Sequence, residues 1–170
     1  MANLIIIRGY PGSGKTTIGK LLQKKGIGIF IDHNAILTFI AGIVGNDDGI
    51  YDDIHKLELI MTSKLLKEGE SVIVARGFSG SNSIDSYLKL ANANHSEAIV
   101  IRLEADFTVL KSRVTSPERK KDFNPTVNSE ALNHWISKNP LEKISGEFII
   151  DASENIATVL NKVELLIKSN

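Results

Sequence analysis

The chain has 170 residues, the length of one ordinary domain, so we expect a single domain over residues 1–170. Apolar residues make up 42% and charged residues 24%, which excludes a disordered, collagen-like or coiled-coil protein. Lys and Arg together number 20, as do Asp and Glu. This zero net charge argues against general nucleic-acid binding, which usually brings an excess of basic residues.

The chain contains no cysteine, which excludes disulfides, thiolate nucleophiles and cysteine zinc sites. The apolar run at residues 4–7 is interrupted by Arg8, so it is too short for a signal peptide or a membrane span. We therefore expect a cytoplasmic protein that does not bind membranes.

Short apolar runs alternate with helical patterns along the chain. The apolar runs predict strands at residues 3–8, 27–32, 71–76, 97–103 and 146–151. Apolar residues at helical spacing predict helices at residues 15–25, 34–44, 51–68, 81–93, 105–115, 129–138 and from about 153 onward. This alternation is typical of an α/β fold with three layers, in which helices cover both faces of a parallel five-stranded sheet.

Two segments invite a functional interpretation from composition alone. The predicted helix at residues 34–44 is rich in Ile and Ala and contains a Phe, which indicates either a buried helix or the wall of a substrate site. Residues 116–128 are polar and charged and contain two prolines. We expect them to belong to a lid within about residues 115–140 that is mobile without ligand.

Residues 9–16 read GYPGSGKT and match the pattern G-x-x-x-x-G-K-[ST] between a predicted strand and a predicted helix. In such a P-loop, glycines let the backbone curl around phosphates, whose charge the loop amides and the helix N-terminus attract. Lys15 would reach the β- and γ-phosphates of ATP, and the Thr16 hydroxyl would bind Mg²⁺. The predicted phosphate site comprises Gly9, Pro11, Gly12, Ser13, Gly14, Lys15, Thr16 and Thr17.

Other motifs narrow the class of P-loop protein. The chain lacks the Asn-Lys-x-Asp motif with which GTPases read guanine, and the third predicted strand ends in Arg76 and Gly77 without an acid. An acid ends the second strand, a basic segment follows the fourth, and Ile-Asp-Ala-Ser (residues 150–153) follows the fifth. On these features the chain resembles the adenylate-kinase-like P-loop kinases, and most closely the branch of chloramphenicol phosphotransferase, polynucleotide kinase and zeta toxin.

This resemblance implies ATP- and Mg²⁺-dependent transfer of the γ-phosphate to a hydroxyl of a small molecule or nucleotide. Asp32 lies at the carboxyl end of the second predicted strand, where ligands bind in open α/β sheets. The resemblance gives Asp32 the role of orienting or deprotonating the acceptor hydroxyl, and Asp32 could also hold Mg²⁺ through water. The alternative is a helix cap for the segment that begins at His33, which could itself touch the acceptor.

The resemblance also implies basic residues on the lid that close over ATP. Arg113 would stack on adenine, and Arg119, with Lys120 as a substitute, would clamp the γ-phosphate during transfer. The alternative for these side chains is a solvated basic turn. Asp151 is expected in a loop near the adenine.

Arg76 departs from the family pattern, in which an acid near this position often orients the water shell of Mg²⁺. It would contact an anionic group of the acceptor, or else form an ion pair with Asp32 or another acid. Two other functions remain open on sequence grounds. The chain could be a nucleotide-binding switch with little turnover, or a kinase that acts on nucleic-acid 5′ ends.

Overall fold

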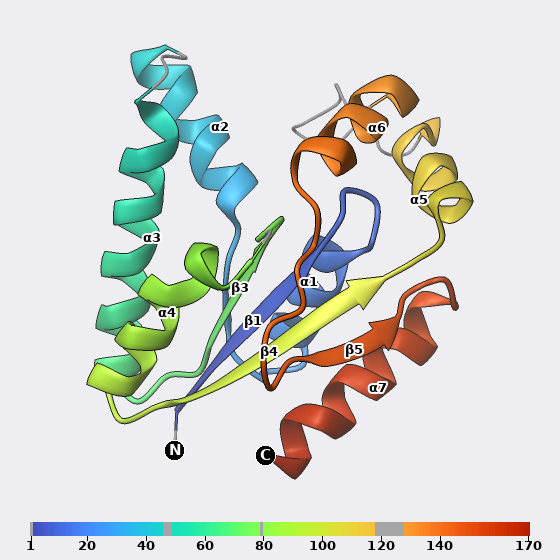
Figure 1. Ribbon diagram of the computed structural model, residues 1–170. Coiled ribbons are helices and arrows are strands. Elements are labelled where there is room, and N and C mark those ends of the chain that lie inside the picture. The colour runs from blue at the N-terminus through green and yellow to red at the C-terminus, as the bar shows by residue number, and fades with distance from the viewer. Residues whose placement is uncertain (1, 46–48, 79, 118–127) are drawn as a thin grey trace.

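The computed structural model describes residues 2–45, 49–78, 80–117 and 128–170. Its elements in chain order are β1 (Asn3–Gly9), α1 (Lys15–Lys24), β2 (Ile29–Ile31), α2 (His33–Val44), α3 (Ile50–Lys67), β3 (Val72–Arg76), α4 (Ser81–Ala93), β4 (Glu97–Glu104), α5 (Phe107–Val114), α6 (Ser129–Lys138), β5 (Phe148–Asp151) and α7 (Ile156–Ser169) (Figure 1). The strands form one parallel five-stranded sheet in the order β2-β3-β1-β4-β5.

The predicted fold class is confirmed, and each predicted strand and helix is found near its expected place. Three strands are shorter than their apolar runs: β2 covers only residues 29–31 of the predicted 27–32, β3 begins at Val72 and β5 begins at Phe148. The core of the predicted lid, residues 118–127, lies outside the described residues.

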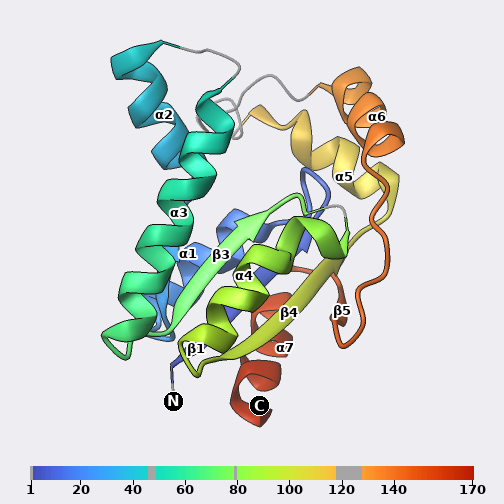
Figure 2. The same cartoon turned by 60° about the vertical axis from the view of Figure 1, so that its left-hand side comes forward.

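The sheet is covered on both faces because its central strand is apolar on both sides. Ile5 and Ile7 of β1 pack with α1 and α7 on one face. Leu4 and Ile6 pack with α3 and α4 on the other face (Figure 2). A strand buried in this way has no polar alternation, which is why β1 appears in the sequence as a continuous apolar run.

Arg8 interrupts this core, and its side chain is fully buried in β1. Its Nη1 donates to Glu147 Oε2 at 3.1 Å, and its Nη2 donates to the carbonyl oxygen of Glu142 at 2.9 Å. Burial lowers the pKa of Arg8, and the Glu147 carboxylate opposes that shift. The segment between α6 and β5 is therefore tied to the central strand by a buried ion pair.

Helices α2 and α3 extend beyond the carboxyl ends of the strands on one side, and α5 and α6 rise on the other (Figure 1). Helix α2, which the structure describes in full, buries none of its side chains. Phe39, Ile43 and Val44 are each about two-thirds exposed, so of the two alternatives predicted for this helix, burial was wrong. None of the described helices has the length and apolar character needed to cross a lipid bilayer.

Candidate functional site

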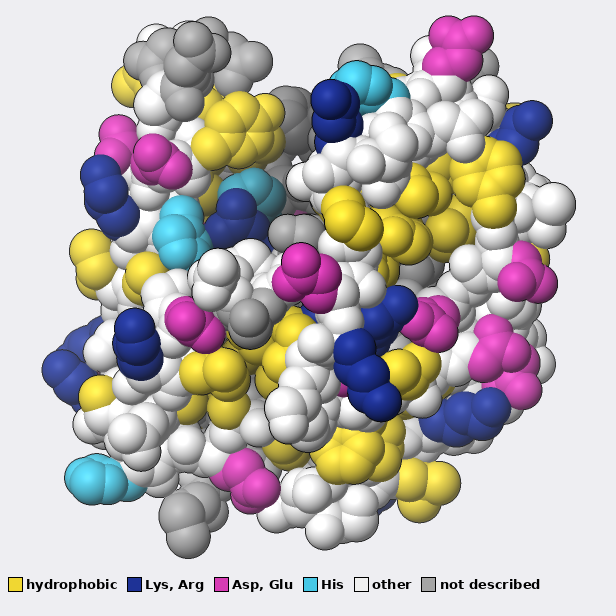
Figure 3. Space-filling view, viewed as in Figure 1, with side chains coloured by type: hydrophobic (Ala, Val, Ile, Leu, Met, Phe, Trp, Pro, Cys, Tyr) yellow, Lys and Arg dark blue, Asp and Glu magenta, His cyan; other side chains and the backbone are white. Residues whose placement is uncertain are grey.

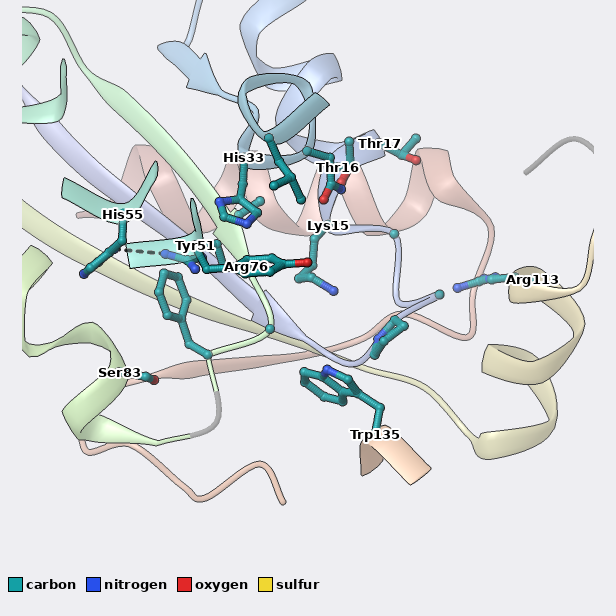
Figure 4. A pocket seen from close by; sticks show the side chains of 18 of the residues that line it. Lys15, Thr16, Thr17, His33, Tyr51, His55, Arg76, Ser83, Arg113 and Trp135 are labelled. Carbon is teal, nitrogen blue, oxygen red and sulfur yellow. Dashed lines mark hydrogen bonds between the residues drawn. The ribbon is translucent and has the colours of Figure 1, made fainter. Parts of the chain in front are cut away.

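A cavity of about 1000 Å³ opens at the carboxyl ends of the strands, between the two raised pairs of helices. In the space-filling view it appears as a hollow with histidine and basic (Lys or Arg) side chains beside it (Figure 3). Its floor is the predicted P-loop segment, residues 9–16. Figure 4 shows His33, His55 and Arg76 on one side of Lys15 and Arg113 on the other. We call the first side the acceptor side and the second the nucleotide side, after the ligands that the sequence leads us to expect there.

The P-loop segment has the curled backbone that its glycines predict. Gly12 has a φ of 86°, and a Cβ there would lie 2.9 Å from the carbonyl oxygen of Leu110, so this position requires glycine. The Lys15 Nζ donates to the carbonyl oxygen of Tyr10 at 2.9 Å. The predicted residues that line the cavity are Pro11, Gly12, Gly14, Lys15, Thr16 and Thr17. Gly9 ends β1, and Ser13 is buried behind the loop.

Asp32 caps helix α2, as the alternative prediction proposed. Its Oδ1 accepts hydrogen bonds from the amides of Asn34 at 3.1 Å and Ala35 at 3.4 Å. Its Oδ2 lies 3.1 Å from Lys20 Nζ, in an ion pair whose lysine side chain is 61% exposed. Asp32 is described but is not one of the residues that line the cavity, whereas the next residue, His33, is.

Arg76 pairs with Glu58 of α3 and not with Asp32. Its Nη1 lies 3.2 Å from Glu58 Oε2 and 2.9 Å from His55 Nδ1. Its guanidinium also lies 5.7 Å from the centre of the Phe78 ring, within range of a cation–π contact. The Arg76 side chain therefore lines the cavity, while its charge is held by the buried carboxylate of Glu58, which is not itself a lining residue.

Glu58 is the centre of a network that sequence reasoning missed. The residue is only 2% exposed, and its carboxylate binds side chains from three other elements. His33 Nδ1 of α2 lies 2.8 Å from Oε1, while the Tyr87 hydroxyl of α4 donates to Oε2 at 3.0 Å, beside Arg76 of β3. Glu58 thus fixes the acceptor side of the cavity.

This network changes the ionisation of its members. Burial, with the Glu58 carboxylate as the next cause, raises the pKa of the Tyr87 hydroxyl. Burial and then the charge of Arg76 lower the pKa of His55, and Glu58 opposes this shift. His55 is consequently neutral near pH 7, and it accepts from Arg76 through Nδ1.

Trp135 of α6 also lines the cavity, and in Figure 4 it lies beside the P-loop, toward the bottom of the view. Its ring meets that of Tyr10 edge-on, with 5.8 Å between the ring centres. A Cβ on Gly77 would lie 2.7 Å from the indole, so glycine at the end of β3 is what lets the ring approach. The Tyr10 hydroxyl accepts a hydrogen bond from the amide of Leu141 at 3.1 Å, which joins the P-loop to the segment that follows α6.

On the nucleotide side, Arg113 extends from α5 to the turn after β5. Its Nη1 donates to the carbonyl oxygen of Ala152 at 2.7 Å, and its Nη2 to that of Glu154 at 3.3 Å. In the same turn, Asp151 Oδ1 accepts from the amide of Ser153 at 2.8 Å, and this hydrogen bond lowers the pKa of Asp151. Arg113 lines the cavity, whereas Arg119 and Lys120 lie outside the described residues.

Comparison with solved structures places this geometry among known folds. The chain is similar to a sugar kinase from Janibacter sp. HTCC2649, with a TM-score of 0.71, 15% identity and coverage of 99% of this chain and 95% of that one. It is also similar to a gluconokinase from Sinorhizobium meliloti 1021 (TM-score 0.65, 18% identity, coverage 98% and 92%). A third similar structure is a shikimate kinase from Bacteroides thetaiotaomicron (TM-score 0.67, 16% identity, coverage 98% of both chains).

At these identities the structures show the fold alone, which is that of the P-loop kinases. A comparison with curated protein sequences found no match. A family model described as AAA domain matches residues 4–139. That range covers more than half of the chain and includes every described residue that lines the cavity except Ile156, so the chain belongs to the AAA domain family.

Proposed function

We propose that the protein is a phosphotransferase that moves the γ-phosphate of ATP to a hydroxyl of a small molecule or nucleotide. The observation that carries this proposal is one cavity with two different sides. The P-loop segment leads on one side to Arg113 and on the other to a polar wall formed by α2, α3 and β3. A nucleotide and a second molecule can therefore meet over Lys15. Three similar folds whose names identify them as kinases support the same class.

The P-loop residues would hold the phosphates of ATP. The amides at the start of α1 and the Lys15 ammonium supply donors and positive charge at the cavity floor. The chemistry of the site also fits Mg²⁺, because Thr16 brings a hydroxyl oxygen to the cavity and this ion takes its other ligands from phosphates and water. Mg²⁺, when bound, would offset the negative charge on the β- and γ-phosphate oxygens.

Asp32 remains our proposed proton acceptor, and the two ends of its carboxylate suggest how it combines two roles. Oδ1 is committed to the helix cap, whereas Oδ2 pairs with a lysine that is largely exposed and can turn away. We propose that the acceptor hydroxyl oxygen attacks the γ-phosphorus while its proton passes to Asp32 Oδ2. The bond from the γ-phosphorus to ADP breaks, ADP leaves, and Asp32 returns the proton to solvent. Asp32 could also hold a Mg²⁺-bound water.

The remaining predicted side chains would act around these groups. His33 and Arg76 form the acceptor wall, Arg113 and the turn containing Asp151 form the nucleotide side, and Arg119 would clamp the transferred phosphoryl group. Arg113 already holds the turn after β5 through two carbonyl oxygens. This contact supports a role for Arg113 beside the nucleotide base, because it joins α5 to the turn after β5 on the nucleotide side of the cavity.

Acceptor-dependent consumption of ATP tests this function directly. The panel contains shikimate and gluconate, their uncharged counterparts methyl shikimate and glucitol, a set of nucleosides, and a short oligonucleotide with a 5′ hydroxyl. We expect a phosphorylated product, identified by mass spectrometry, from a small-molecule member and none from Lys15→Ala.

The alternative of a nucleotide-binding switch is supported by the end of β3, where Arg76 stands in place of an acid. ATP binding without a phosphorylated product from any member of a broad acceptor panel would favour that alternative. Transfer to the oligonucleotide that weakens steeply with salt would favour a nucleic-acid end kinase.

A further inference from the structure

The acceptor side of the cavity carries an arginine whose charge is already compensated. Among the described lining residues, Arg76 is the cation on this side, since Lys15 belongs to the P-loop and Arg113 to the nucleotide side. The Glu58 carboxylate lies 3.2 Å from Arg76, is 2% exposed, and receives further hydrogen bonds from His33 and Tyr87. A carboxylate held from three elements cannot swing away to release the guanidinium.

Two other described side chains on this wall, His55 and Asp52, also affect its charge. His55 accepts a hydrogen bond from Arg76 and is kept neutral by burial and by that arginine. Asp52, at the start of α3, brings a negative charge to the rim. Two carboxylates of described residues, those of Glu58 and Asp52, therefore oppose the single guanidinium of Arg76 on this wall.

Apolar surfaces complete the same compartment. Leu37 of α2, the Phe78 ring and the Trp135 indole line it. The indole packs directly against Gly77, and this packing fixes the position of the ring. A ring or an apolar carbon skeleton could lie against these surfaces while hydroxyl groups meet the histidines and Arg76.

We propose that this compartment selects an uncharged hydroxyl compound, and that Glu58 is the specificity-determining residue that keeps carboxylate and phosphate compounds out. The identification of the compound as the phosphoryl acceptor rests on the function proposed above. An anionic ligand would have to compete with Glu58 for Arg76 and would leave two carboxylates facing each other across one guanidinium. An uncharged ligand does not compete with Glu58 for the charge of Arg76, and needs only to form hydrogen bonds with the polar side chains that face the cavity.

The chain provides its own reporter, because Trp135 is the only tryptophan and lies in the cavity wall. The P-loop is first filled with a non-hydrolysable ATP analogue and Mg²⁺, and tryptophan fluorescence is then followed during titration with inorganic sulfate. We expect no saturable response in the parent protein. In Glu58→Gln, where the charge of Arg76 is no longer compensated, sulfate should bind with a Kd at least about tenfold below the highest concentration at which the parent shows no response.

The double variant Glu58→Gln/Arg76→Gln is the matched control, since it removes both charges and should lose the gained sulfate binding. If Glu58→Gln binds sulfate no better than the parent, the proposal is overturned. If Glu58→Gln does not fold, the parent protein decides: sulfate binding that disappears in Arg76→Gln would overturn the proposal, and its absence supports it.

The same titration with matched pairs measures selectivity in the parent protein. Methyl shikimate and glucitol should bind at least as tightly as shikimate and gluconate, and Glu58→Gln should shift the preference of each pair toward the acid. An acid bound more tightly than its uncharged counterpart by the parent would contradict the proposal. Because these are binding measurements, a failure of phosphoryl transfer would refute the proposed function but leave the selectivity of the compartment in place.

Discussion

Replacing Asp32 by asparagine separates its structural role from its proposed catalytic one. Asparagine keeps an oxygen at the Oδ1 position, so the hydrogen bonds to the amides of Asn34 and Ala35 can persist. The variant loses the ion pair with Lys20, and an ion pair with a 61% exposed lysine contributes less than about 1 kcal/mol. Asp32→Ala also loses the cap, which costs about 1 kcal/mol more in unfolding free energy. Urea denaturation measures both values.

The Asp32 variants should affect the rate of phosphoryl transfer differently from the unfolding free energy. If Asp32 Oδ2 takes the proton, both Asp32→Asn and Asp32→Ala should lower the transfer rate at saturating acceptor by roughly 10²-fold or more, with ATP binding unchanged. Lys20→Ala is the control, because it removes the same ion pair and leaves the carboxylate; its transfer rate should stay within a few-fold of the parent. A transfer rate for Asp32→Asn within that range would refute the proposed role and leave Asp32 as a helix cap.

Four further outcomes are expected. Lys15→Ala should remove most binding of ATP·Mg²⁺ in titration calorimetry, and unchanged affinity would mean that the phosphates bind elsewhere. Arg119→Ala should lower turnover more than ATP affinity, and hydrogen exchange over residues 113–128 should slow when ATP·Mg²⁺ binds; equal exchange with and without nucleotide would argue against a lid. Leu132→Ala, at a fully buried position between α5 and α6, should lower the unfolding free energy by about 2–5 kcal/mol in urea, and a parent-like value would contradict the packing described. Because the pKa of His55 is lowered in the folded protein, stability from this residue is complete above its unfolded pKa of about 6.5 and is lost as the pH falls below it. His55→Gln should flatten that part of the stability–pH curve, and an unchanged curve would exclude His55 as its source.

The structural features that could be predicted from the sequence are those that depend on residues close together in the chain. A buried parallel strand needs apolar residues on both faces, so β1 and β3 appear as continuous apolar runs. The P-loop is a local motif in which one stretch of backbone supplies most of the geometry. The cap at Asp32 was also predictable, because an N-cap binds amides two or three residues ahead.

The acceptor wall could not be predicted in the same way. Glu58 meets His33, Arg76 and Tyr87 across separations of 25, 18 and 29 residues, and no short pattern records such a meeting. One signal was present: Glu58 occupies the same helical stripe as Ile54, Thr62 and Leu66, all of them buried. A carboxylate on the inward stripe of a helix requires polar partners. Arg76 was already predicted to pair with an anionic group, so Glu58 could have been considered as its partner.

The ion pair between Arg8 and Glu147 has a consequence for how the protein is made. Glu147 follows Arg8 by 139 residues, so Arg8 leaves the ribosome well before its partner does. Until then the central strand carries a guanidinium without this partner in what will become the interior. Breaking a buried ion pair of this kind costs about 3–5 kcal/mol, a large part of the stability of an ordinary domain. We therefore expect nascent chains that end before the segment from Glu142 to Glu147 to remain sensitive to protease, and the sheet to become resistant only after that segment has left the ribosome.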